Sequence, residues 1–356
     1  MDKPVQLTAP VLAALQQPVP AGATLWEDQP ELFARLRRRL ASYAPNTQRA
    51  LAADWRAWRA WCAANDRIPF PARPSDLVDY LLAHSPPPEL DASGAVAMDR
   101  EATGPKIRRA STVQRWLASL STLHRIAEHA DPTREQDVKA ARRSLSRGRM
   151  APDQKAPLRW ADVEKALATL GNDPADLRAK AMIAVAYSTL ARRAELIDIR
   201  IADITFGTES DGTVTLRTKG GDQKERYLAS EARAALEAWL DFARINDGFV
   251  FRRLEQTGNI GERTITAREV ARTFKRIAGM IDLDSARPQS RISGHSTRIG
   301  AAQDLTAAGA ALPEIMIAGG WKSPQMPAHY ARKLDARQGA MQRWLTVARK
   351  RGTSKK

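Results

Sequence analysis

The chain contains very few of the residues that bind metals or form disulfides: one cysteine and five histidines among 356 residues. Cys62, as the single cysteine, excludes an internal disulfide and any cysteine-rich zinc site. The histidines are scattered and include no HExxH-type pair, so the sequence predicts no dedicated metal site. Any chemistry is therefore expected to rest on side chains that need no metal.

Long apolar runs and acidic residues are also scarce. No apolar run approaches the roughly 18 residues that cross a bilayer, and the start, "MDKPVQLTAPVLAALQQ", lacks the basic region and cleavage pattern of a signal peptide. Against 56 Lys and Arg there are only 40 Asp and Glu, a net charge of +16. Such an excess attracts polyanions. The composition predicts a cytoplasmic, nucleoid-associated protein that faces DNA and has no membrane partner.

Composition shifts along the chain divide it into parts. Residues 1–28 are rich in Ala, Pro and Gln without helical periodicity and are predicted to form a disordered arm. Helical patterns predict one domain over 29–148 and another over 158–356, each long enough for its own core. Between them a basic stretch with Gly and Pro and no apolar anchors predicts a linker at 149–157.

Helical periodicity dominates both predicted domains. In the first, a helix is expected to follow Asn46 as its N-cap, with one apolar face formed by Leu51, Trp55, Trp58 and Cys62. Residues 74–84 predict a second, shorter helix. Residues 85–106 predict a long loop, whose function the sequence leaves open. In the second domain, "TVTLRTKGGDQKERYLAS" (213–230) predicts a β-hairpin around a Gly-Gly turn. The fold class is therefore mainly α, with one small antiparallel sheet in the second domain.

A DNA strand transfer through tyrosine would need a defined set of side chains. The phosphodiester gains negative charge in the transition state, and arginine forks match its non-bridging oxygens. An acid must protonate the leaving 5′ oxygen, and a base or hydrogen-bonding group must help the phenol to lose its proton. The pattern to look for is two arginines, a lysine or histidine acid, a histidine and a tyrosine.

Candidates for each of these groups occur in the second domain. "SGHSTRIG" places His295 and Arg298 on one face at the start of a predicted helix. "TLARRAELIDIR" places Arg192 within an apolar, buried helix, where Glu195 one turn later could orient it. Lys219 lies at the hairpin tip beside two glycines, from which it could reach into a site.

Two further candidates lie in "GGWKSPQMPAHYARK". Tyr330 is one of five tyrosines, and Trp321 could donate its indole N–H to a phosphate. Each candidate alone has an ordinary explanation: a core Trp, a solvated hairpin Lys, a helix-terminal His. Their joint occurrence in one order is what distinguishes them.

The ordered set is similar to the catalytic pattern of a known family. The segments "AYSTLARRAELIDIRIADI", "SGHSTRIGAA", "PEIMIAGGW" and "HYARKLDARQGAM" resemble the tyrosine recombinase (phage integrase) family, as does "RAWRAWCAANDRIPFPARPSDLVDYLL" in the first half. The resemblance covers roughly residues 35–345. It implies a two-domain, C-shaped DNA clamp, with a helical core-binding domain at 29–148 and a catalytic domain at 158–356.

The resemblance also implies roles. Tyr330 would attack the scissile phosphate, giving a 3′-phosphotyrosine and later a Holliday junction. The non-bridging oxygens would be held by Arg192 and Arg298, with hydrogen bonds from His295 and Trp321. Lys219 would be the general acid, and Glu195 would support the site. No cofactor, metal or ATP is implied.

Partners and DNA contacts follow from the same resemblance. The protein would be a monomer in solution and a homotetramer on two specific sites in double-stranded DNA, joined by a C-terminal docking helix around 335–348. Candidate DNA-binding residues, at positions that read DNA in the family or free to meet phosphate, are Arg268, Arg115, Arg49, Ser111 and Ala50. Among these Arg268 suits a bidentate contact with guanine.

Other functions fit parts of the pattern. A type IB topoisomerase shares the Tyr, Arg and Lys chemistry but not the first domain or the docking helix. A non-catalytic DNA-binding protein on the same fold would not need the full catalytic set. A metal-dependent transposase would need clustered carboxylates, and the candidate site has one. The target sequence, the spacer length, the biological task and the need for accessory proteins are left open.

Overall fold

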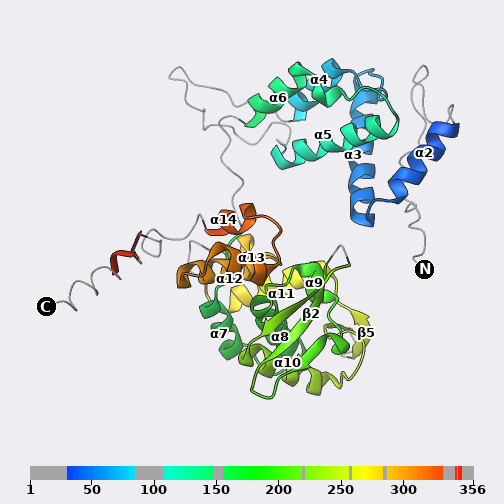
Figure 1. Ribbon diagram of the computed structural model, residues 1–356. Helices are drawn as coiled ribbons and strands as arrows, with labels where there is room; N and C mark the ends of the chain where they lie inside the picture. Colours follow the sequence, from blue (N-terminus) through cyan, green and yellow to red (C-terminus); the bar gives the residue numbers. More distant parts are fainter. Residues whose placement is uncertain are drawn as a thin grey trace. The chain divides into compact units, whose positions relative to one another are not determined.

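The computed structural model divides into two compact units, residues 1–153 and 154–356, which are described separately here (Figure 1). The residues described are 30–84, 108, 110–146, 155–218, 221–255, 259–283, 287–331, 341–342 and 344–346. The predicted arm at 1–28, the loop at 85–106 and most of the linker at 149–157 lie outside them.

The described part of the first unit is helical, as predicted. Its helices are α2 (Pro30–Ala41), α3 (Pro45–Ala64), α4 (Pro74–His84), α5 (Ala110–Ile126) and α6 (Gln136–Ser146). The expected N-cap of α3 is wrong by two residues: Ala44 occupies that position and Pro45 begins the helix. Proline favours the first helical position because its fixed φ suits the helix and its missing N–H needs no partner there.

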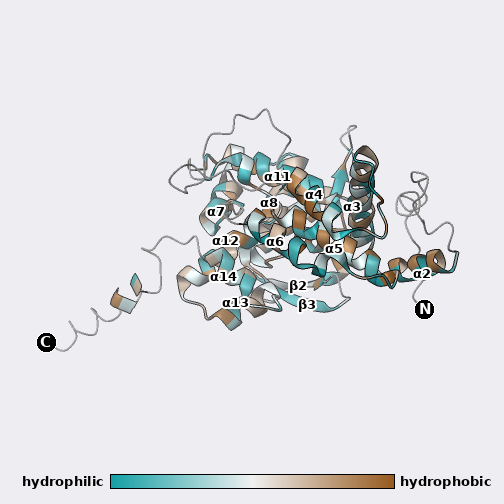
Figure 2. Cartoon of the chain, turned by 90° about the horizontal axis from the view of Figure 1, so that it is seen from above, coloured by the Kyte–Doolittle hydropathy of each residue, from teal (hydrophilic) through white to brown (hydrophobic). Residues whose placement is uncertain are grey.

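The predicted apolar face of α3 forms the centre of this unit's core. Leu51, Trp55, Trp58 and Cys62 are all buried. Trp58 stacks on Trp61 and donates its indole N–H to the Pro69 carbonyl at 2.8 Å. Each of the helices α2 to α5 carries both hydrophilic and hydrophobic residues, as the colouring in Figure 2 shows. No helix in the described ranges is long and apolar enough to cross a membrane.

The second unit combines helices with two small antiparallel sheets. Its helices are α7 (Trp160–Thr169), α8 (Pro174–Ser188), α9 (Arg193–Ile197), α10 (Ser230–Ala243), α11 (Ala267–Met280), α12 (Ser296–Ala308), α13 (Leu312–Gly319) and α14 (Gln325–Ala331). Its strands are β1 (Ile204–Phe206), β2 (Gly212–Arg217), β3 (Gln223–Leu228), β4 (Arg252–Leu254) and β5 (Ile260–Thr264).

The predicted hairpin is confirmed as β2 and β3, which pair from Gly212↔Leu228 to Arg217↔Gln223. β1 adds to the β2 edge, giving the order β1-β2-β3. The expectation of a single sheet is wrong, because β4 and β5 form a second one. These two strands are short and rich in charge, so they carry no alternating pattern that sequence analysis could recognise.

Helix α8 is the central element of the second unit. Residues on all of its faces are buried, among them Ala179, Met182, Ile183 and Val185. A helix that is apolar all round must be surrounded by other elements. In this unit α7, α10, α11 and α12 pack against it.

The segment that enters the second unit is held against α12. The Ala156 N–H donates to the Arg291 carbonyl at 3.2 Å, and the Leu158 N–H to the Ser296 carbonyl at 2.9 Å. Ala156, near the end of the predicted linker, is thus a buried part of the unit. Gly300 permits this approach, since a Cβ there would overlap the Leu158 carbonyl group.

Replacing Gly300 should therefore destabilise the second unit. We expect Gly300→Ala to lower the free energy of unfolding by about 1–3 kcal/mol, as overpacking of a close contact does, despite the better helix propensity of alanine. Urea unfolding of the full chain measures the change. The matched control is Gly279→Ala in α11, where the added Cβ meets the end of a flexible side chain, Gln289. Equal losses in both variants would contradict the explanation.

Candidate active site

Arg298 lies in the first turn of α12 and is almost fully buried, with 2% of its surface exposed. Its guanidinium donates to the Leu190 carbonyl and, at 2.6 Å, to the Gly319 carbonyl. The Arg298 Cζ also lies 4.0 Å from the ring centroid of Trp321, a cation–π contact. Burial and the charge of Arg192 lower the pKa of Arg298 to about 10, so the group stays charged at neutral pH.

Arg192 acts on the Arg298 guanidinium but does not lie inside a helix. The prediction that Arg192 belongs to a buried helix is therefore wrong. Helix α8 ends at Ser188, Leu190 has a positive φ of 50°, and Arg192 is the N-cap of α9. Glu195 accepts the Arg192 backbone N–H at 2.8 Å and its guanidinium at 2.6 Å. The carboxylate thus orients the side chain, as predicted from spacing, while 40% of the side chain remains exposed to a ligand.

Tyr330 belongs to the short helix α14 and is 8% exposed. Its ring meets Trp321 edge to face, with centroids 6.0 Å apart, and it packs on Ile299 and Ile315. Burial raises the pKa of the phenol above its ordinary value, and the charges of Arg298 and Arg192 oppose that rise. Both arginines therefore act electrostatically on the phenol.

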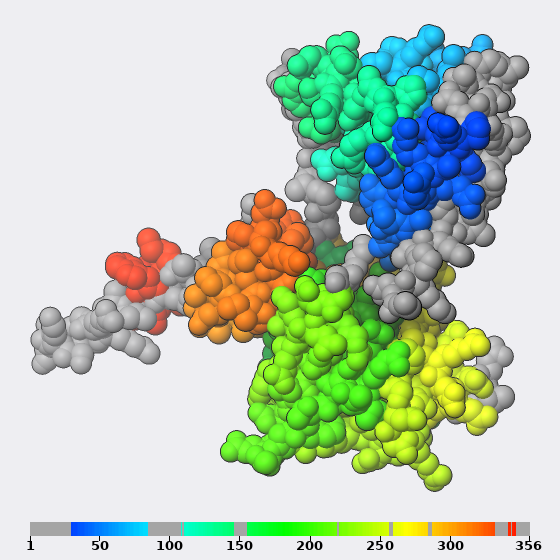
Figure 3. All heavy atoms as spheres, turned by 45° about the vertical axis from the view of Figure 1, so that its right-hand side comes forward, coloured from blue at the N-terminus to red at the C-terminus, as the bar shows by residue number. Residues whose placement is uncertain are grey.

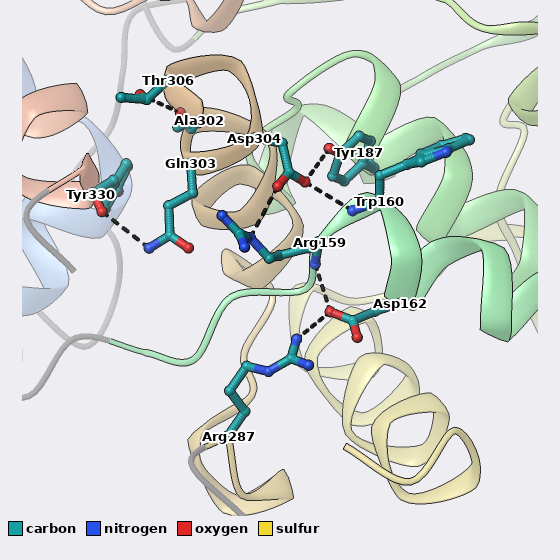
Figure 4. A network of polar contacts seen from close by, with 10 residues as sticks. All are labelled: Arg159, Trp160, Asp162, Tyr187, Arg287, Ala302, Gln303, Asp304, Thr306 and Tyr330. Carbon is teal, nitrogen blue, oxygen red and sulfur yellow. Dashed lines mark hydrogen bonds and ion pairs between the residues drawn. The ribbon is translucent and has the colours of Figure 1, made fainter. Parts of the chain in front are cut away.

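A polar network anchors the helix that carries Arg298 on two sides (Figure 4). Gln303, which is buried, turns its amide toward α14 and donates to the Tyr330 carbonyl at 3.1 Å. Asp304 turns the other way and accepts the Tyr187 hydroxyl at 2.6 Å and the Trp160 N–H at 2.9 Å. The Arg159 guanidinium also contacts Asp304, at 3.0 Å. The network joins α7, α8, α12 and α14.

His295 is the N-cap of α12, immediately before the buried first turn. His295 as a whole residue is exposed, yet the surrounding protein still partly desolvates its imidazole ring. This desolvation, with the charges of Arg193, Arg298 and Arg192, lowers the pKa of His295 below its ordinary value. The side chain of Arg193 packs on Gly294, where an added Cβ would lie 2.7 Å from the Arg193 Cδ.

The remaining candidates are Lys219 and the DNA-binding residues. Lys219 lies outside the described residues, between the ends of β2 and β3. The candidate DNA-binding residues are distributed over both units: Arg49 and Ala50 on α3, Ser111 and Arg115 on α5, and Arg268 on α11. Arg115 pairs with the buried Asp54 at 2.9 Å, Arg49 with Asn46 at 2.6 Å, and Arg268 is exposed.

Sequence analysis missed two residues of the site. Gln303 was hidden because one buried amide has no spacing signal. Arg226 on β3 acts electrostatically on Arg298 and lies against Gly320, where an added Cβ would be 2.5 Å from the Arg226 Nη2. The available signal was alternation, since Lys224 and Arg226 share the strand face of the buried Leu228.

Comparisons with known proteins identify the family of the chain. A profile of the phage integrase family matches residues 157–337. The recombinase Cre of Escherichia phage P1 is 30% identical over 353 residues, covering 92% of this chain and 95% of Cre. An integrase/recombinase xerD homolog of Selenomonas ruminantium is 27% identical, covering 77% of this chain and 78% of the homolog.

The fold also resembles solved structures. The XerH site-specific recombinase bound to a palindromic difH substrate superposes with a TM-score of 0.59. The match covers 92% of this chain and 91% of XerH at 14% identity. At a sequence identity this low, the match shows a shared fold and nothing about function.

The charge cluster around His295 leads to a prediction that needs no substrate. Removing a neighbouring positive charge favours the imidazolium, so Arg193→Gln should raise the pKa of His295. The pH dependence of the imidazole proton resonances measures the shift, with His295→Gln identifying the signal. Arg263→Gln, which removes an exposed arginine of β5, is the control and should leave the value unchanged. A downward or absent shift in Arg193→Gln would contradict the explanation.

Proposed function

The chain belongs to the phage integrase family and is a site-specific tyrosine recombinase; on this premise we propose that Tyr330 is the nucleophile with which it cleaves double-stranded DNA. One observation carries the proposal. Arg298 and Arg192 donate to neighbouring carbonyls, at Gly319 and Gly320, and both act on the Tyr330 phenol. Two anchored cations beside a phenol make a binding site for a phosphate that the phenol attacks.

In the proposed reaction the Tyr330 oxygen forms a bond to the scissile phosphorus while the bond to the 5′ oxygen breaks. Arg192 and Arg298 hold the non-bridging oxygens, and the Trp321 indole N–H adds a hydrogen bond. The phenol proton passes to the neutral imidazole of His295, directly or through water. Lys219 supplies the proton that the departing 5′ oxygen takes up. The result is a 3′-phosphotyrosine and a free 5′ hydroxyl.

The phosphotyrosine keeps the energy of the broken phosphodiester, so religation needs no nucleotide hydrolysis. A 5′ hydroxyl from a second site attacks the phosphotyrosine, releases Tyr330 and produces a Holliday junction. Repetition on the other strands completes recombination. Glu195 supports both directions because it holds Arg192 by two hydrogen bonds.

The DNA partner and the assembly belong to the same proposal. Residues 29–148 would form the core-binding domain, residues 149–157 the linker and residues 158–356 the catalytic domain of a clamp around the duplex. Arg268 is exposed at the start of α11 and free to read a base. Arg115 keeps 48% of its side chain exposed while the buried Asp54 orients it. XerH was solved bound to its difH substrate, which supports double-stranded DNA as the partner.

A homotetramer on two DNA sites is proposed for strand exchange, with the segment 335–348 docking on the next protomer. Most of that segment lies outside the described residues. Met341 and Trp344, which are described, are 68% and 63% exposed. Two large apolar side chains on one short segment favour a partner surface.

Covalent trapping tests the nucleophile. The recognition site is first selected from a pool of random duplexes, and a nick is placed so that the cleaved strand diffuses away. We expect wild-type protein to form a covalent DNA adduct that survives EDTA, and Tyr330→Phe to form none. Tyr227→Phe, which alters an exposed tyrosine, is the matched control and should keep full yield. An adduct persisting in Tyr330→Phe would falsify the assignment. Strand exchange between two sites then separates recombination from simple DNA relaxation.

Leaving-group chemistry tests the general acid. Lys219→Ala should slow cleavage by about 10²–10⁴-fold, the usual contribution of proton transfer. A 5′-bridging phosphorothiolate substrate should restore the rate, because its sulfur leaves without a proton. Lys224→Ala serves as the control on the same hairpin and should show no such selective rescue. An equal defect on both substrates would exclude Lys219 as the acid.

A further inference from the structure

Strand β3 presents two cations on its inner face. Lys224 and Arg226 are half-buried and pair across the sheet with the buried Leu216 and Val214. The residues between them point the other way and are exposed. Alternation therefore directs both long basic side chains to the side of the strand that faces the interior of the unit.

This face meets the turn after α13. A Cβ on Gly320 would lie 2.5 Å from the Arg226 Nη2 and 3.7 Å from the Lys224 Cδ. Arg192 donates to the Gly320 carbonyl, and Arg298 to the Gly319 carbonyl. Figure 3 shows the orange surface of α12 to α14 beside the green surface of the sheet region. One turn thus brings three guanidinium groups together.

The charge of Arg226 is not neutralised nearby. In the described part of the chain it makes no ion pair within 4.0 Å, and its hydrogen bond is a long one, 3.4 Å to the neighbouring Glu225 carbonyl. Burial lowers the pKa of Arg226, and Arg192 lowers it further, while Glu195 opposes both. Glu195 is already committed to Arg192.

The local charge balance points to an anion. Among the described residues, Glu195 is the carboxylate that acts on all three arginines around the turn. A half-buried cation without a carboxylate partner is partly desolvated, so an anionic ligand that supplies the counter-charge would stabilise it. The phosphodiester that Tyr330 attacks acquires a second negative charge as the new bond forms, which a third guanidinium would stabilise.

We propose that Arg226 is a third phosphate-binding arginine, which contacts a non-bridging oxygen of the scissile phosphate together with Arg192 and Arg298. The inference rests on the proposed function and extends the set of residues that contact the reacting group. Arg226 acts through charge, and a contact that only supported the Gly320 turn would not respond to the charge of the substrate.

Substrate charge provides the decisive comparison. Arg226→Gln and wild type are assayed on the nicked substrate with either the native scissile phosphate or a methylphosphonate, in which a methyl group replaces one charged oxygen. On the native phosphate we expect cleavage to fall about 10²–10³-fold, as for loss of one oxyanion donor. On the methylphosphonate the difference should shrink to less than about tenfold, because there is less charge to stabilise.

Three controls make the result specific. Arg263→Gln removes an exposed arginine on β5 and reports any general loss of DNA affinity. Arg226→Met fills the same space without charge and must show the same selective defect, which guards against misfolding of the glutamine variant. A methylphosphonate at the neighbouring phosphate should leave the defect unchanged.

Several outcomes would overturn the inference. Normal cleavage by Arg226→Gln would do so, as would an equal defect on native phosphate and methylphosphonate. If the defect of Arg226→Gln shrank only with the methylphosphonate at the neighbouring position, Arg226 would contact that phosphate instead of the scissile one. A wild type that forms no adduct would defeat the proposed function together with this inference. A wild-type adduct with an undiminished Arg226→Gln defeats the inference alone.

Discussion

The buried guanidinium of Arg298 is the contact on which the rest of the site depends. Burying an arginine is unfavourable unless its donors are satisfied. Here the carbonyls of Leu190 and Gly319 accept hydrogen bonds from Arg298, while the Trp321 ring covers one face of the guanidinium. Those partners come from three segments: the break after α8, the end of α13 and the turn that follows. Displacing any of them would leave a buried charge without a partner, so one side chain fixes their mutual geometry.

The choice of carbonyls, rather than carboxylates, has an electrostatic consequence. The last carbonyls of a helix carry partial negative charge and lack intrahelical partners, so they bind cations without neutralising them. Arg298 uses the C-terminal end of α13 in this way, and its guanidinium is thereby positioned while most of its charge remains available. Arg192 also donates to the Gly320 carbonyl at that end, but its charge is partly offset by the ion pair with Glu195. An ion pair at Arg298 as well would hold that side chain as firmly and attract phosphate less.

How much of this could be predicted depends on how local each signal is. The face of α3 that carries Trp55 and Trp58, the β2–β3 hairpin and the start of α12 at His295 follow from spacing within one element, and all three were predictable. The break at Leu190 was not, because it requires a positive φ that apolar residues rarely adopt and that only the surrounding packing imposes. An apolar run with helical spacing continues through it in the sequence.

Gln303 and Arg226 were missed for a different reason. Each acts on a residue far away in the chain, Tyr330 and Gly320 respectively. Gln303 belongs to no pattern that periodicity or a motif could detect, and strand alternation places Arg226 on the inner face of β3 without showing what it meets there. Contacts between residues so far apart in the sequence become visible only when the helices and the sheet are packed together.

The same cluster of positive charge also acts on His295, the proton acceptor of the proposed reaction. With burial, the arginines lower the pKa of His295 below its ordinary value of about 6.5, so the imidazole is neutral at pH 7 and able to accept a proton. Burial meanwhile keeps the Tyr330 phenol protonated. When a phosphate binds, its negative charge offsets the arginines, which raises the proton affinity of His295. The imidazole therefore becomes a stronger base when the phosphate arrives, and the enzyme needs no reactive phenolate before DNA is bound.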